Sequence, residues 1–226
     1  MINTLDLAVK YHAKYLFTSS AVVYGEDVGE RNLLKETDQG VVNHLSARAC
    51  YDEGKRFAET CVETYRQAHG IDAKIARVFT TYGSNMRLFE KQLIPDFIVN
   101  ALEGKDLVIY GDEEFSTSLC YVTDMVDGLV RLMGSEPEVK VVNFGVDEAT
   151  KYADVAKMIL EMTSSKSRLI FEKPLLFLTK KGTPSIAYAK DALGWFPLVR
   201  LEDGLRKTID YVIAKKETLM FENYGK

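Results

Sequence analysis

The sequence predicts an α/β fold built on a parallel sheet. Short apolar runs that suit buried strands alternate with longer segments in which apolar residues recur every three to four positions, as in amphipathic helices. The 226 residues are 46% hydrophobic and 27% charged, a composition typical of a globular chain with a buried core. Small hydroxyl residues follow the first apolar run. Functional residues are therefore expected at strand ends, because open α/β sheets bind ligands there.

The first elements alternate regularly. Residues 2–13 predict a helix, because apolar side chains recur there at helical spacing. Residues 15–19 form a short apolar run before small polar residues, which predicts a buried strand. The polar segment from residue 25 to about 46 shows no periodicity and is expected to be a loop. Loops of that length inside a domain are usually functional.

The clearest helix is predicted at residues 46–69. Its apolar residues follow one face, and Gly70 supplies the kind of residue that ends helices. The apolar run at 73–79 then predicts a second strand. A strand–helix–strand unit of this kind is the connection that parallel strands require.

The remaining elements are shorter and more mixed. In chain order they are a helix at about 91–103, a strand at 107–110, a strand at 118–122, a helix at 123–133, a strand at 139–144, a helix at 152–163, and helices at about 185–193 and 201–216. This change predicts a soft domain boundary near residue 85, which divides the chain into residues 1–85 and 86–226.

Composition argues against several classes of function. The 29 basic and 33 acidic residues give a net charge of −4 without a basic stripe, so nucleic acid is not an expected partner. No run approaches the ~20 apolar residues of a membrane-spanning helix, so no membrane partner is expected. Three histidines and no Cys-x-x-Cys pattern leave no expected metal site. The three cysteines, Cys50, Cys61 and Cys120, are expected to be reduced thiols of a cytoplasmic protein.

Tyr51 and Lys55 are the first candidate pair for chemistry. At i and i+4 on the predicted helix their side chains emerge on the same face. A nearby ammonium favours the phenolate form of a tyrosine, which makes the phenol usable as an acid/base. The alternative interpretation is an exposed lysine beside a tyrosine at the edge of the core. The Tyr-x-x-x-Lys pattern alone does not decide between the two.

Ser19 and Ser20 end the first predicted strand. At the carboxyl end of a parallel strand, Ser20 can hydrogen-bond a substrate hydroxyl while Tyr51 takes or gives the proton. The alternative is simple capping of the strand end by the two hydroxyls. A strand-end serine, a Tyr-x-x-x-Lys helix and a strand ending in Arg77-Val78-Phe79 are together far more specific than any one part.

Some other residues have a structural interpretation. Trp195 is expected to be a packing anchor, and Thr123 or Asp124 is expected to cap the helix that begins there. The loop carboxylates Glu26 and Glu36 have two interpretations: they belong to a substrate loop, or, as is usual for loop charges, they are solvated. We expect the second. The histidines show no partnering pattern and are expected at the surface: His12, His44 and His69.

The ordered motifs resemble a known family. Extended short-chain dehydrogenase/reductases that act on nucleotide sugars, the NAD-dependent epimerase/dehydratase family, carry stretches similar to TSSAVVYGE, RACYDEGKRFAET, ARVFTTYG, YVTDMVDGLVRLM, VNFG and ALGWFP. The likeness runs from residue 2 to about 213. RACYDEGKRFAET and MRLFEKQLIPDFIVNALEGKDLVIYGD look most like UDP-glucuronate decarboxylases, whereas the SSAxVYG stretch looks more like sugar 4-epimerases.

This resemblance implies a fold and a chemistry. It implies part of an NAD-binding Rossmann-like parallel sheet, followed by a smaller α+β C-terminal region that mainly binds the nucleotide sugar, with some elements returning to the sheet. NAD transiently oxidises the sugar at C4 in this family. By resemblance Tyr51 is the acid/base, Lys55 assists it and holds the nicotinamide ribose, and Ser20 helps. The resemblance implies that the cofactor residues are Ser19, Tyr51, Lys55 and Phe79. It implies that the substrate residues are Ser20, Val22, Thr80, Tyr110 and Thr117.

The chain also departs from the family pattern. The likeness begins in the middle of the family's Rossmann domain, and the Gly-x-x-Gly-x-x-Gly phosphate loop is absent from this sequence. We therefore expect a carboxyl-terminal part of a longer enzyme, recorded from an internal Met or a truncated gene, that does not bind NAD tightly by itself.

The substrate side departs as well. Val22 stands where the decarboxylases carry a Glu, and Thr80 stands where the family carries an Asn that meets the diphosphate. Thr117 and Gly182 align with arginines, and each lost charge-assisted hydrogen bond costs ~1.5–3 kcal/mol.

Three functions therefore remain open. The first is UDP-glucuronate decarboxylation by a longer NAD-dependent enzyme, with sugar 4-epimerisation as its alternative. The second is an inactive relic that acts in binding or dimerisation, since the resemblance implies a homodimer through helices 2–13 and 46–69. The third is a split enzyme whose dinucleotide-binding half is a separate polypeptide.

Overall fold

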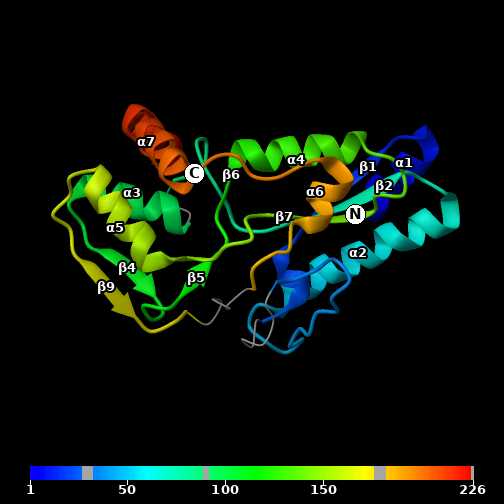
Figure 1. Ribbon diagram of the computed structural model, residues 1–226, viewed down its shortest axis with the longest axis horizontal. Coiled ribbons are helices and arrows are strands. Elements are labelled where there is room, and N and C mark those ends of the chain that lie inside the picture. The colour runs from blue at the N-terminus through cyan, green and yellow to red at the C-terminus, as the bar shows by residue number, and fades with distance from the viewer. Residues whose placement is uncertain (27–32, 89–91, 176–181, 225–226) are drawn as a thin grey trace.

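A computed structural model of the chain describes residues 1–26, 33–88, 92–175 and 182–224, with side chains described as far as Lys215. Its centre is a parallel sheet of three strands in the order β1-β2-β7 (Figure 1). These strands are β1 (Tyr15–Ser20), β2 (Ala73–Val78) and β7 (Val141–Phe144). The α/β fold with a parallel sheet is confirmed.

Helices cover both faces of this sheet (Figure 1). On one face, α1 (Ile2–Tyr11) and α2 (Ala49–His69) pack on Ala73 and Ile75 of β2, through Leu5 of α1 and Val62 of α2. The other face carries α4 (Val122–Gly134), α6 (Ala187–Leu193) and the Trp195 ring. Parallel strands need such crossover helices, and α2 is the crossover from β1 to β2.

The register of β1 on β2 runs in step from Tyr15 opposite Ala73 to Ser20 opposite Val78. Both strands therefore end together, and Ser19 lies directly beside Arg77 on the face that α2 covers. In the part of the chain that the structure describes, no strand pairs with the other edge of β1. The candidate functional residues Ser19 and Ser20 thus end a strand with one open edge.

A second group of elements forms the left side of Figure 1. Here β4 (Leu107–Tyr110) pairs in parallel with β9 (Leu169–Glu172), and two further pairs are β3 (Thr81–Tyr82) with β6 (Cys120–Tyr121) and β5 (Ser116–Thr117) with β8 (Thr150–Lys151). The helices α3 (Leu93–Glu103), α5 (Tyr152–Met162) and α7 (Leu201–Tyr224) accompany them. This group has its own apolar core around Phe97, Ile98 and Ile159.

Some predicted boundaries were wrong. The long helix begins at Ala49 rather than 46, because residues 43–48 form turns in which Ser46 N donates to Asn43 O and Ala49 N to Ser46 O. The final helix extends to Tyr224 rather than 216. Residues 27–32 of the predicted loop and residue 91 of the predicted helix lie outside the described residues.

Asp124 does not cap its helix as predicted, and neither does Thr123. Helix α4 starts at Val122, with Tyr121 at its N-cap and no side-chain cap. The Asp124 carboxylate instead accepts hydrogen bonds from the backbone N–H groups of Leu198 and Val199, at 2.9 and 2.8 Å. The predicted packing role of Trp195 is confirmed: its ring is buried against Phe144 at 4.9 Å between centroids.

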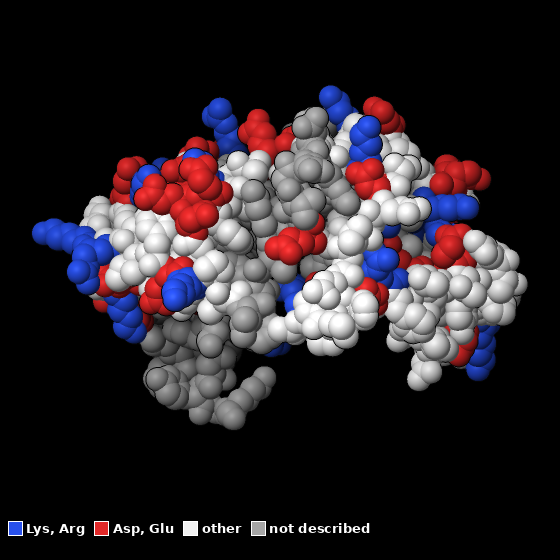
Figure 2. Space-filling view, turned by 90° about the horizontal axis from the view of Figure 1, so that it is seen from below, with Lys and Arg blue, Asp and Glu red and all other residues white. Residues whose placement is uncertain are grey.

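Charged side chains of both signs are interspersed over the face of the molecule seen in Figure 2. That face therefore shows no large field of one sign. Among the described helices, none is long and apolar enough to cross a bilayer.

Candidate functional site

The site is organised by one face of α2. Tyr51, Lys55 and Glu59 follow one another at intervals of four residues, so their side chains leave the helix on the same side. Lys55 Nζ donates to Thr18 O at 2.8 Å, at the open edge of β1, and lies 5.8 Å from the centroid of the Tyr51 ring. The predicted pairing of Tyr51 and Lys55 on one helix face is confirmed.

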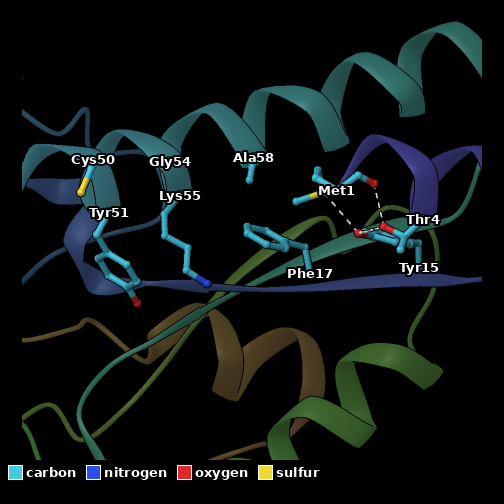
Figure 3. A pocket seen from close by; sticks show the side chains of 9 residues that line it. All are labelled: Met1, Thr4, Tyr15, Phe17, Cys50, Tyr51, Gly54, Lys55 and Ala58. Carbon is cyan, nitrogen blue, oxygen red and sulfur yellow. Dashed lines mark hydrogen bonds between the residues drawn. The ribbon is translucent and has the colours of Figure 1, made fainter.

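Tyr51 and Lys55 border an open pocket of about 430 Å³ (Figure 3). In that view both side chains extend from α2 past the edge of β1, with the phenol oxygen and the ammonium pointing the same way. The pocket is lined by Met1, Thr4, Tyr15, Phe17, Cys50, Tyr51, Gly54, Lys55 and Ala58. The Tyr51 side chain is 45% exposed, so a ligand can reach it.

The two strand-end serines have different surroundings. Ser19 is only 3% exposed, and its Oγ donates to Glu59 Oε1 at 2.6 Å. Ser20 is half-buried, and its Oγ accepts a 3.5 Å hydrogen bond from Val22 N at the start of the short helix η1 (Ala21–Tyr24). Ser20 therefore caps η1 in this structure, while the Ser19 hydroxyl is hydrogen-bonded to Glu59 of α2.

A buried polar network lies behind the serines. Arg77 donates to both carboxylate oxygens of Glu59, at 2.8 to 3.3 Å, and to Tyr24 Oη at 2.8 Å. Burial lowers the pKa of Arg77, but the hydrogen-bonded Glu59 carboxylate outweighs it and the net pKa is raised. Burial raises the pKa of Tyr24 to about 12 although Arg77 opposes this.

Glu36 belongs to this network and is not a solvated loop charge as predicted. Its Oε1 accepts from Asn143 N at 2.8 Å, and its backbone oxygen accepts from Arg77 at 2.9 Å. Burial raises the pKa of the Glu36 carboxyl. A polar pocket of about 590 Å³, lined by Glu36, Glu59 and Arg77 among others, lies beside Glu36.

The three histidines, His12, His44 and His69, are exposed, as predicted.

Sequence reasoning missed Glu59 and the role of Arg77. The available signal was the continuation of the Tyr51–Lys55 spacing by one more turn to a carboxylate, together with an arginine in a strand whose other residues, apart from Lys74, are apolar. A charge on the face that a helix covers needs a partner, which these two residues supply to each other.

The predicted substrate residues are placed in two groups. Thr80 and Thr117 come together, with 2.9 Å between their hydroxyl oxygens, at the junction between the central sheet and the second group of elements. Tyr110 ends β4 with its side chain partly exposed. Val22, predicted for the substrate, and Phe79, predicted for the cofactor, are both buried, Phe79 against the Tyr24 ring. Their contacts with ligands stay predictions.

The residues present fit one end of an NAD site. Tyr51 and Lys55 offer a phenol and an ammonium at an open pocket, the groups that the resemblance implies for the nicotinamide ribose. Gly25, Gly40 and Gly83 do not supply the open backbone that a pyrophosphate-binding glycine loop needs. A Cβ on Gly25 or Gly40 would meet backbone atoms at 1.8 and 2.0 Å, and on Gly83 the Val122 side chain at 2.5 Å. The space beside these three glycines is therefore already filled by other atoms of the chain.

Comparison with known proteins agrees with this geometry. The family model described as the NAD dependent epimerase/dehydratase family matches residues 1–145. UDP-glucuronic acid decarboxylase 1 of Danio rerio is 38% identical over 217 residues, which are 96% of this chain and 51% of that protein. UDP-glucuronic acid decarboxylase 3 of Arabidopsis thaliana is 36% identical over 204 residues, 90% of this chain and 59% of that protein. The chain thus spans about half the length of the curated relatives it matches.

Two solved structures that superimpose on this chain belong to nucleotide-sugar epimerases and share its fold. The UDP-glucose 4-epimerase of Thermotoga maritima with UDP-glucose superimposes with a TM-score of 0.86 at 25% identity, covering 94% of this chain and 67% of that one. The UDP-glucuronic acid 4-epimerase of Bacillus cereus in complex with UDP-glucuronic acid and NAD gives 0.83 at 25% identity, covering 93% and 65%. The sequence match and the Rossmann-type fold together show that the chain belongs to the NAD dependent epimerase/dehydratase family.

Proposed function

We propose that this chain carries the acid/base residues of an NAD-dependent enzyme that modifies a nucleotide sugar, with UDP-glucuronate decarboxylation as the first candidate. The observation that carries the proposal is the convergence of Tyr51 and Lys55 on an open pocket beside the carboxyl-terminal half of β1. Relatives named UDP-glucuronic acid decarboxylase support the substrate. The division into a cofactor part, residues 1–85, and a mainly substrate-binding part, residues 86–226, belongs to this proposal.

The described side chains suggest which residue performs each step of the reaction. Tyr51 Oη takes the proton of a sugar hydroxyl and later returns it. The Lys55 ammonium stabilises the phenolate that this transfer creates. Ser20 ends the strand whose Thr18 oxygen holds Lys55, and its hydroxyl is the proposed donor to the sugar. NAD, when bound, supplies reversible hydride acceptance.

Sugar 4-epimerisation is the second candidate, and Val22 is the observation that favours it. The resemblance places a carboxylate at this position in the decarboxylases, whereas Val22 is apolar and buried. The paired hydroxyls of Thr80 and Thr117 do not separate the two candidates, because both substrates carry a diphosphate. They offer it weaker contacts than an amide and a guanidinium would, which favours the binding or dimerisation function instead.

The test uses protein purified from its source cells, so that any further segments or partners are retained. It is incubated with NAD and UDP-glucuronate, and products are separated by anion-exchange chromatography. Release of CO₂ with a UDP-pentose supports decarboxylation, and a UDP-hexuronate of altered C4 configuration supports epimerisation. Tyr51→Phe should abolish either product. The proposal fails if wild-type protein yields neither product, and the binding or dimerisation function then becomes the better explanation.

We propose in addition that α1 and α2 pair with a second copy of the chain. Leu7 and Tyr11 of α1 and Phe57 of α2 are large apolar side chains exposed on these helices. Sedimentation velocity should give twice the monomer mass, and Phe57→Glu should halve it.

We also propose that the protein is cytoplasmic. All three cysteines are free thiols, which supports a reducing compartment.

A further inference from the structure

Tyr51 has cations on both sides along α2. Lys55 follows it by one turn, and Arg48 precedes it by about one turn. The Arg48 guanidinium carbon lies 5.0 Å from the Tyr51 ring centroid, closer than the Lys55 ammonium at 5.8 Å. Lys55 is also engaged by Thr18 O at 2.8 Å. The nearer cation to the ring is therefore the arginine.

Arg48 is itself held in place. Its Nε donates to Asp52 Oδ1 at 3.0 Å, and the Asp52 side chain is buried while the Arg48 side chain is only partly exposed. Asp52 lies in the first turn of α2, where the helix dipole favours a carboxylate. A carboxylate fixed in this way orients the guanidinium plane, since arginine presents its donors in a rigid fork.

The ring of Tyr51 needs such an orienting contact. Tyr51 is 45% exposed, so packing against the rest of the chain constrains its ring only in part. A cation over the face of a tyrosine ring is attracted by the ring quadrupole, and a guanidinium stays charged at any working pH. The contact therefore favours one orientation of the ring beside the pocket that Tyr51 lines.

We propose that Arg48, held by Asp52, is a positioning residue that orients the Tyr51 phenol toward its pocket. The residues concerned form the pattern Arg-x-x-Tyr-Asp-x-x-Lys. In it Arg48 contacts the Tyr51 ring, Asp52 holds Arg48, and Lys55 binds the edge of β1. The catalytic meaning of this positioning rests on the proposed function, whereas the positioning itself does not.

The test observes the ring without turnover. Protein labelled with ¹³C in its tyrosine rings is compared with Arg48→Met, which keeps an unbranched side chain but removes the charge, and Tyr51→Phe assigns the resonance. Arg48→Met should shift the Tyr51 ring signals and reduce the population of the native rotamer about two- to fivefold, the range of an exposed cation–π contact. Arg48→Lys should restore part of both changes, and Asp52→Asn should act in the direction of Arg48→Met.

A matched control is available on α1. Lys10 lies 5.2 Å from the Tyr11 ring centroid, so Lys10→Met removes a similar cation from a different tyrosine and should leave the Tyr51 signals unchanged. Circular dichroism of each variant checks that the helices persist. Unchanged Tyr51 signals in folded Arg48→Met overturn the proposal, and so does a shift that Arg48→Lys fails to reverse in part.

Kinetics separates this proposal from the function on which its meaning rests. If the source protein turns over a nucleotide sugar, Arg48→Met should lower kcat about two- to fivefold with KM nearly unchanged, because none of the proposed substrate residues is altered. If the source protein shows no turnover, the proposed function fails while the ring signals still decide whether Arg48 positions Tyr51. An active Arg48→Met variant with wild-type kcat overturns the catalytic meaning.

Discussion

Replacing Arg77 by methionine is expected to lower the free energy of unfolding by about 3–5 kcal/mol. Arg77 and Glu59 are each 13% exposed at the side chain, and three contacts of 2.8 to 3.3 Å join them. Methionine retains the apolar stem but leaves the Glu59 carboxylate buried without its cation. Breaking a buried pair from one side costs about 3–5 kcal/mol for this reason. Tyr24 Oη and Glu36 O lose a donor as well.

The assay is urea unfolding followed by the fluorescence of Trp195, the only tryptophan of the chain. With a slope of about 2 kcal/mol per molar urea, the midpoint of unfolding should fall by about 1.5–2.5 M while the slope stays constant. That is a large share of the 5–15 kcal/mol typical of a domain. The double variant Arg77→Met/Glu59→Gln should recover part of the loss, since no uncompensated charge remains.

Lys157→Ala is the matched control. Lys157 pairs with Asp154 at 3.5 Å on the surface of α5, where both side chains are at least half exposed. Its removal should cost no more than ~1 kcal/mol. The reasoning is refuted if Arg77→Met costs as little as this control, or if the double variant is no more stable than Arg77→Met alone.

Three further predictions can be tested on the same protein. Gly128→Ala should cost about 1–3 kcal/mol by urea unfolding, because its Cβ would lie 2.5 Å from the Phe144 ring, whereas Gly54→Ala meets nothing within 4 Å and should stabilise α2 by about 0.5–1 kcal/mol. Burial raises the pKa of the Cys120 thiol from 9.0 to about 12. Unfolded protein therefore loses this proton first, so stability should fall as pH rises from 9.0 to about 12, and Cys120→Ala should flatten that part of the unfolding profile. A thiol reagent should modify exposed Cys50 in the native protein and the two buried cysteines only after unfolding, as intact mass will show.

The elements that depend on local periodicity could be predicted from the sequence. The alternation of β1, α2 and β2 follows from apolar spacing and from Gly70, which takes the left-handed conformation at the end of α2 with φ of 65°. Tyr51 and Lys55 lie on one face because helical geometry requires it. Strand β9 was not predicted, because it is half exposed and its only described partner, β4, lies far away along the chain.

The parts of the site that sequence reasoning missed depend on tertiary partners. Glu36 is in a polar loop and Asp124 is near a helix start, so local rules predict solvation and capping for them. In the structure Glu36 accepts from the backbone of β7, and Asp124 from backbone groups more than seventy residues away. Spacing along the chain carries no information about such contacts. The same holds for the pairing of Thr80 with Thr117.

One face of α2 links the stability of this protein to its site. Tyr51 faces the open pocket, Lys55 holds the edge of β1 at Thr18, and Glu59 holds Ser19 and Arg77. Glu59 and Lys55 are bonded to successive residues of β1, so they fix the end of the strand against the helix at two points. The position of Ser20 relative to Tyr51 therefore depends in part on the buried Glu59–Arg77 ion pair, although no hydrogen bond of that pair involves either residue. Loss of Glu59 or Arg77 should therefore disturb the proposed acid/base site as well as the fold, because the strand end that carries Ser20 has no strand neighbour on its open side among the described residues.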